Sequence, residues 1–123
     1  MAARVEATDD FHVFLACPDD TPVGSAFLVD VDLDVRNAEL GDVMTPDEQG
    51  NGYATDAAGL CLTHAFDELG LHKVWAQTVE DNGASKRVLE KLGFQQEGVL
   101  REHGHGFGRY TDLHLFGLLE SER

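Results

Sequence analysis

Basic residues are scarce in this sequence. Its 123 residues include nine lysines and arginines, of which three are lysines, against 23 aspartates and glutamates, for a formal net charge of −14. Nucleic-acid binding requires a basic face that neutralises phosphates, so we expect no nucleic-acid partner. The acids are spread from Glu6 to Glu122 rather than gathered in one tail. We interpret this charge as halophilic adaptation, because self-repulsion is screened over about 3 Å at 1 M salt.

Cysteines and long hydrophobic runs are also few or absent. Cys17 and Cys61 stand without CxxC or HxxxH neighbours, so we expect packed, reduced thiols rather than a disulfide framework or a zinc site. No apolar run approaches the length of a membrane span, and the N-terminus lacks the apolar core of a signal peptide. We therefore expect a cytoplasmic protein with no membrane partner and no metal. Length and a hydrophobic content of 42% fit one domain, 1–123.

Apolar periodicity divides the chain into six strands and two helices. The predicted strands are 11–17, 25–35, 38–45, 73–79, 94–103 and 109–119, and the predicted helices are 54–69, stopped by Gly70, and 82–93. The order β-β-β-α-β-α-β-β predicts an α+β fold rather than a regular βαβ repeat. The glycine-rich segment around His103-Gly104-His105 is expected to be a mobile turn rather than part of a metal site.

Two glycines, Gly50 and Gly52, stand one residue apart just before the first predicted helix. A helix N-terminus offers N–H donors without internal partners, and glycines allow an anion to approach them closely. A solvent-capped glycine turn is the alternative. The loop does not fit a Walker motif, which needs Gly-Lys-Ser/Thr, or the dinucleotide pattern, because Thr55 occupies the place of the third glycine.

The segment Gln49-Gly50-Asn51-Gly52-Tyr53-Ala54 matches the pattern Q/R-x-x-G-x-G/A and resembles the pyrophosphate loop of the GNAT acetyltransferase superfamily. VEDNGASKRVLEKLGF (79–94) is similar to a downstream segment of that family. EGVLREHGHGFGRYTDLHLFGLL (97–119) resembles the end of the branch that acetylates ribosomal-protein N-termini. The resemblance covers about 11–119 and implies a mixed, largely antiparallel sheet with helices packed on it, the acyl-CoA N-acyltransferase fold.

The resemblance also implies acetyl-CoA as co-substrate and a set of residues that contact it. These residues are Val43, Met44, Gln49, Gly50, Asn51, Gly52, Tyr53, Ala54, Thr55, Asn82 and Ser85. Backbone amides of the glycine loop and the first helical turn would hold the pyrophosphate, and an amide near Val43 or Met44 would polarise the thioester carbonyl. Asn82 would bond the pantetheine amide and Ser85 would lie close to the sulfur; the alternative is that both only cap the second helix.

Direct attack of an amine on a thioester needs a base or water path, an oxyanion donor and a proton for the leaving sulfur. Glu39 is the candidate base, the alternative being an ordinary exposed strand carboxylate. Many family members carry a tyrosine where this sequence has Leu89, so the candidate acids are Ser85, by analogy with the ribosomal branch, and Tyr110.

The acceptor is predicted from proton affinity. An α-amine titrates at about 7.7–8.0 and a lysine at about 10.4, so more α-amine is neutral at pH 7. A protein or peptide N-terminus is therefore the favoured acceptor, while spermidine-like amines and small metabolites stay open. An acetyl-CoA-dependent N-acetyltransferase is the resulting functional prediction.

The sequence departs from the family at its beginning. Family members usually begin with a further strand and two helices that form one wall of the acceptor site, and this sequence starts at what resembles their second strand. We expect either a minimal enzyme with an open acceptor groove or a gap filled by a partner chain, for example in a homodimer. A non-catalytic CoA-binding or interaction module without an acceptor wall is the alternative function.

Overall fold

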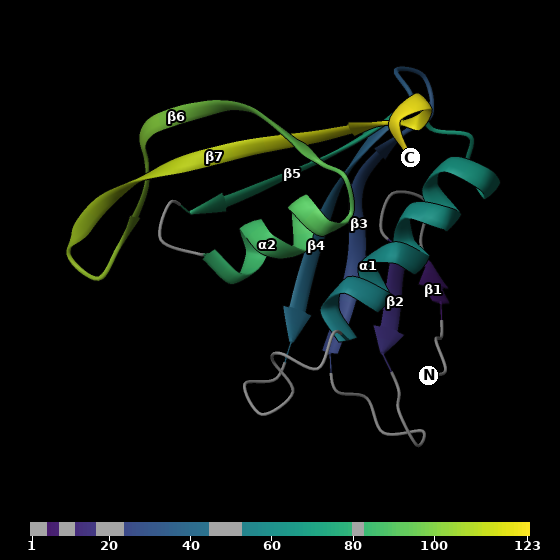
Figure 1. Ribbon diagram of the computed structural model, residues 1–123, viewed down its shortest axis with the longest axis horizontal. Helices are drawn as coiled ribbons and strands as arrows, with labels where there is room; N and C mark the ends of the chain where they lie inside the picture. Colours follow the sequence, from purple (N-terminus) through teal and green to yellow (C-terminus); the bar gives the residue numbers. More distant parts are fainter. Residues whose placement is uncertain (1–4, 8–11, 17–23, 45–52, 80–82) are drawn as a thin grey trace.

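Seven strands form one mixed sheet in the order β1-β2-β3-β4-β5-β7-β6 (Figure 1). The computed structural model describes residues 5–7, 12–16, 24–44, 53–79 and 83–123. The strands are β1 (Val5–Ala7), β2 (His12–Ala16), β3 (Gly24–Asp32), β4 (Asn37–Met44), β5 (Lys73–Val79), β6 (Gln95–Gly106) and β7 (Arg109–Leu119). Only the central pair, β4 and β5, is parallel; the other neighbours are antiparallel. The predicted α+β fold with a largely antiparallel sheet is confirmed.

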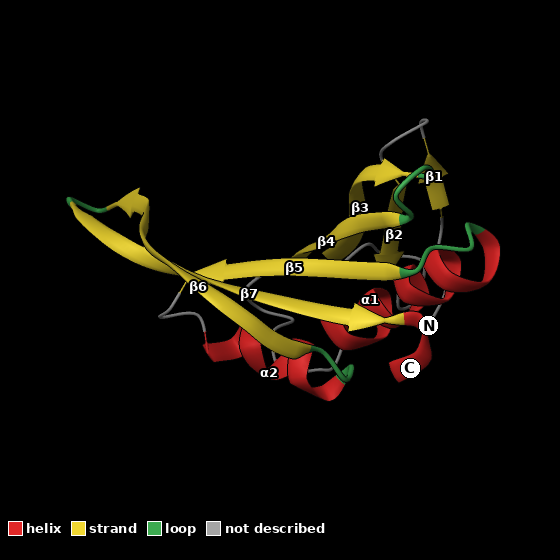
Figure 2. Ribbon diagram, turned by 90° about the horizontal axis from the view of Figure 1, so that it is seen from above, coloured by secondary structure: helices red, strands yellow, loops and turns green. Residues whose placement is uncertain are grey.

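Two helices, α1 (Tyr53–Thr63) and α2 (Gly83–Lys91), lie on the same face of the sheet (Figure 2). The sheet contributes small and branched side chains to this face, with Leu28 opposite Leu40 and Ala38 opposite Val74. The core residues of α1 and of the turn that follows it are Ala57, Ala58, Cys61, Leu62, Ala65 and Phe66. Several of these are alanines, which allow the helix to pack close to the strands.

The opposite face of the sheet has no helix over it among the described residues (Figure 2). Trp75 and Gln77 alternate along β5 with buried residues and therefore point to this face. Glu39 is opposite Trp75, and Gly41 is opposite Phe27. Side chains from β3, β4 and β5 on this face are half-buried or exposed.

Helix α1 runs directly into one π-helical turn, η3 (His64–Glu68). The N–H of Leu69 donates to the carbonyl oxygen of His64 at 3.0 Å, and Gly70 follows with φ of 66°. The predicted helix over 54–69 is therefore confirmed in extent, but its last turn is π-helical. The chain ends in a short 3-10 turn, η4 (Glu120–Glu122). No helix in the described part of the chain is both long and apolar enough to cross a membrane.

Two local expectations need correction, and one strand was missed. The strand predicted over 25–35 ends at Asp32, because the Asp32 carboxylate accepts the N–H groups of Asp34 and Val35 at 2.9 and 3.1 Å and folds the chain into a turn. Strand β1 was not predicted. His103-Gly104-His105 is not a turn but part of β6, and the reversal occurs at Phe107-Gly108, where both residues have positive φ.

Candidate functional site

The two central strands separate partway along their length. The parallel ladder joins Asn37 to Lys73, Ala38 to Val74 and Glu39 to Trp75, and then stops. Beyond that point β4 stays paired with β3 as far as Met44, and β5 stays paired with β7 as far as Val79. Figure 1 shows the two strands running apart. The edges of 40–44 and 76–79 that face this fork are not joined to each other.

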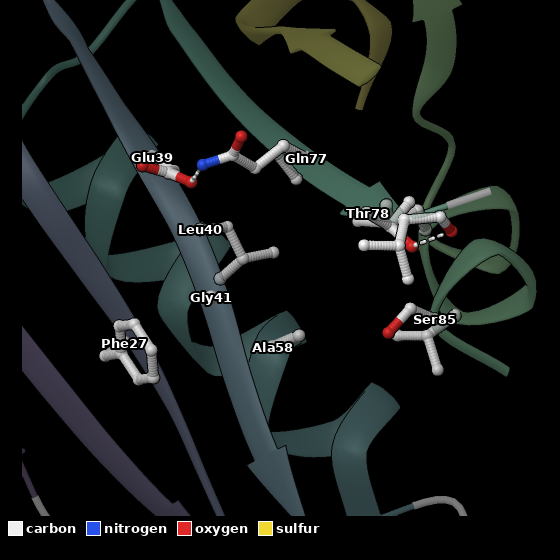
Figure 3. A pocket seen from close by; sticks show the side chains of 12 residues that line it. Phe27, Glu39, Leu40, Gly41, Ala58, Gln77, Thr78 and Ser85 are labelled. Carbon is white, nitrogen blue, oxygen red and sulfur yellow. Dashed lines mark hydrogen bonds between the residues drawn. The ribbon is translucent and has the colours of Figure 1, made fainter. Parts of the chain in front are cut away.

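A pocket of about 340 Å³ occupies the fork (Figure 3). It is lined by Phe27 of β3, by Glu39, Leu40 and Gly41 of β4, by Ala58 of α1, by Ala76, Gln77, Thr78 and Val79 of β5, and by Ser85, Val88 and Leu89 of α2. Three strands and both α-helices therefore contribute residues to the pocket. Its wall combines apolar and polar side chains.

Among the described residues, four polar side chains line the pocket. Gln77 Nε2 donates a hydrogen bond to Glu39 Oε2 at 3.0 Å across the fork. Thr78 Oγ1 donates to the carbonyl oxygen of Val79 at 3.1 Å. Ser85 is on α2, on the opposite side of the pocket from Glu39 (Figure 3). A carboxylate and a hydroxyl thus face one cavity from two sides.

The structure brings two of the three predicted catalytic residues together. Glu39 and Ser85 both line the pocket. Tyr110 lies on the distal part of the β6–β7 hairpin, 64% exposed, with its ring centroid 4.7 Å from that of His105. It is not among the pocket-lining residues.

The predicted cofactor residues divide between described and undescribed positions. Val43 and Met44 end β4, on the fork. Tyr53, Ala54 and Thr55 are the first residues of α1, at the same end of the sheet as the end of β4 (Figure 1). Their N–H groups are among those that an α-helix leaves without intrahelical partners. Four residues before α1 and one residue before α2 lie outside the described residues: Gln49, Gly50, Asn51, Gly52 and Asn82.

Sequence reasoning missed Gln77 as a site residue. The sequence signal was weak, because Gln77 is one amide in the β-prone run KVWAQTV. It follows Trp75 by two residues and therefore lies on the same face of the strand. Cys61, by contrast, is a core residue without pocket contact; burial raises the pKa of its thiol. Its burial fits the expected packed thiol, and Cys17 lies outside the described residues.

Comparison with known proteins identifies the family. Residues 1–95 match the model of the acetyltransferase (GNAT) domain. YoaA of Bacillus subtilis, an uncharacterized N-acetyltransferase, is 35% identical over 69% of this chain and 48% of its own length. YdaF of the same organism, a putative ribosomal N-acetyltransferase, is 34% identical over 71% of this chain and 48% of its own length. The chain thus spans about half the length of these curated relatives.

Solved structures agree with this match. A crystal structure of spermidine N-acetyltransferase from Vibrio cholerae, in complex with CoA and spermine, has a TM-score of 0.86 at 27% identity, covering 93% of this chain and 68% of that one. Another structure of the Vibrio cholerae enzyme is described as dodecameric. The fork, the two helices beneath it and the family match define one class of protein: the chain belongs to the GNAT acetyltransferase family.

Proposed function

We propose that this chain is an acetyl-CoA-dependent N-acetyltransferase that acts on a primary amine. The supporting observation is the pocket at the β4–β5 fork, where Glu39 and Ser85 face one cavity in a chain of the GNAT family. The pocket has the groups that acyl transfer needs: a carboxylate for the amine, a hydroxyl for the leaving sulfur and strand edges whose amides are not joined across the fork.

Acetyl-CoA would bind through main-chain groups. The first-turn N–H groups of α1, at Tyr53 to Thr55, would hold the pyrophosphate, and the amide of Val43 or Met44 would polarise the thioester carbonyl. The net charge of −14 opposes an anionic ligand, but charges beyond about 10 Å are screened at 0.1 M salt. Hydrogen bonds to a charged group contribute about 1.5–3 kcal/mol each. Local donors therefore outweigh the diffuse charge.

In the proposed reaction the amine nitrogen attacks the acetyl carbonyl. A C–N bond forms, the C–S bond breaks, and the electron pair leaves on sulfur. Glu39 takes the proton of the amine, directly or through water, and later releases it to solvent. Ser85 supplies the proton of the thiol and recovers one from solvent. Tyr110 has no part in this scheme because it does not line the pocket.

A protein or peptide N-terminus is the proposed acceptor. Glu39 is the one carboxylate among the described residues that line the pocket, which suits an amine carrying a single charge better than a polyamine with several. The lower proton affinity of an α-amine also reduces the demand on the base. Spermidine is the second candidate, because a Vibrio cholerae enzyme of similar structure acts on it.

The proposal is tested by acetyl transfer to three acceptors: a peptide with a free N-terminus, an N-terminally blocked peptide that contains lysine, and spermidine. We expect the free N-terminus to be acetylated with the highest kcat/KM. Glu39→Gln should lower kcat by about 10²-fold or more and Ser85→Ala by a smaller factor, both with CoA binding retained. Glu120→Gln, in the C-terminal turn, is the matched surface control.

Two outcomes would contradict the proposal. Binding of CoA without turnover of any amine would favour a non-catalytic CoA-binding or interaction module. Absence of CoA binding, measured by calorimetry, would exclude both functions. Self-association stays a prediction, which sedimentation velocity with and without CoA would check.

A further inference from the structure

We propose that Gln77 is a positioning residue that orients the Glu39 carboxylate toward the acceptor amine without neutralising it. This inference rests on the proposed function. It deepens that function because the neutral Gln77 side chain would set the orientation in which the Glu39 carboxylate contacts a cationic acceptor.

The hydrogen bond lies at the apex of the fork. The β4–β5 ladder ends at Glu39 and Trp75, and continuation by two residues would have placed Gln77 opposite Gly41. The strands diverge instead, and the Gln77 side chain reaches back to Glu39 Oε2 at 3.0 Å (Figure 3). One oxygen of the carboxylate is thereby fixed, and Oε1 is left to meet a substrate.

The donor is an amide although a cation lies nearby on the same strand. Lys73, four residues before Gln77 on the same face of β5, donates to Glu97 Oε1 at 2.7 Å. No cation in the described part of the chain forms an ion pair with Glu39. A lysine or arginine partner would cancel the charge of Glu39, whereas an amide donor orients the carboxylate and leaves its full charge for an incoming ammonium.

A role in stability alone does not account for this bond. Gln77 is exposed and Glu39 is half-buried, and exposed polar pairs add little to stability because water competes and two long side chains must be ordered. The backbone beyond the apex is already held by the ladders of β4 with β3 and of β5 with β7. The bond therefore fixes a side chain more than it fixes the strands.

The test combines three acetyl-transfer measurements on the full chain with the preferred amine. Gln77→Met keeps the length of the side chain and removes the donor; we expect kcat to fall about tenfold, with unchanged KM for acetyl-CoA and unchanged Tm. Gln77→Lys restores a donor but neutralises Glu39; we expect it to recover part of kcat and to raise KM for the amine several-fold. In a Glu39→Gln background, Gln77→Met should have no further effect on kcat.

The chain offers a matched control. Gln95 Nε2 donates to Glu122 Oε2 at 2.7 Å, the same pair of groups outside the pocket, so Gln95→Met should leave kcat and both KM values unchanged. Wild-type kinetics for Gln77→Met, or a lower Tm with weaker acetyl-CoA binding, would overturn the positioning role while leaving the proposed function in place. A wild-type chain that binds CoA and acetylates no amine would overturn both.

Discussion

Replacing Gly41 by alanine should destabilise the protein because Phe27 already occupies the space of the added methyl group. An ideal Cβ on Gly41 would lie 2.4 Å from Phe27 Cε2 and 2.6 Å from Cζ, where ordinary contact begins at 3.4 Å. The ring would have to move by about 1 Å, and such overpacking costs about 1–3 kcal/mol. Alanine also lowers the conformational entropy of the unfolded chain relative to glycine, which offsets about 0.4–1 kcal/mol of this cost. The midpoints of these two ranges give a net loss of about 1.3 kcal/mol.

Urea unfolding followed by circular dichroism measures this loss directly. For a chain of this length, 1 kcal/mol corresponds to about 4 °C in Tm, so thermal unfolding should show a decrease of about 5 °C. Shortening the neighbour should relieve the clash: in a Phe27→Leu background, Gly41→Ala should cost about 1 kcal/mol less than in the wild type. The pocket is affected too, because both residues line it.

Gly59→Ala provides the control. Gly59 lies inside α1, and its Cβ would meet no heavy atom within 4 Å. Alanine there should stabilise the protein by about 0.5–1 kcal/mol through helix propensity alone. If Gly41→Ala were as stable as the wild type while Gly59→Ala behaved as expected, Phe27 would not cover Gly41.

Three further predictions concern the Cys61 thiol and the net charge. The native protein should protect Cys61 from alkylation, detected by peptide mass spectrometry, until urea unfolds it, because the side chain is fully buried; rapid labelling of the native chain would contradict this. Burial raises the pKa of this thiol, so its contribution to stability is complete below its unfolded pKa of about 8.5 and is lost as pH rises above it. The urea midpoint should fall between pH 7.5 and 9.5, and less so in Cys61→Ala. With a net charge of −14, the midpoint should also rise between 0.1 and 1 M KCl, as the screening length shortens from about 10 to about 3 Å; equal stability in dilute buffer would exclude halophilic adaptation.

Elements with a strong local pattern were predictable from the sequence. Strand β5 has the predicted bounds, 73–79, because the run KVWAQTV is rich in β-branched and aromatic residues, which favour strands. Strand β1 has three residues, too few for any periodicity to show. The end of β3 depends on one side chain, the Asp32 carboxylate, which competes with the ladder for backbone donors.

Site residues that the family resemblance covers were predictable from the sequence. Contacts that depend on the register between strands were not. Glu39 and Ser85 share a pocket, but nothing in their spacing required it. The contact of Gln77 with Glu39 depends on the offset between β4 and β5, which α1 and η3 separate in the chain. Tyr110 was chosen for its residue type, and the register of β6 with β7 places it opposite His105 instead.

The β4–β5 fork stays open because each of its two strands is paired with another strand on its outer edge. At the other end of the β4–β5 ladder, away from the fork, the N–H groups of His72 and Lys73 both donate to the carbonyl oxygen of Arg36, at 2.8 and 3.2 Å, which fixes the start of the ladder. Beyond the apex, β4 remains paired with β3 and β5 with β7. Opening the fork therefore forgoes hydrogen bonds along one edge of each strand, about 1 kcal/mol each when water replaces them. A cleft prepared in this way needs little rearrangement on binding, so changes in Glu39 orientation should come through Gln77 rather than through movement of the backbone.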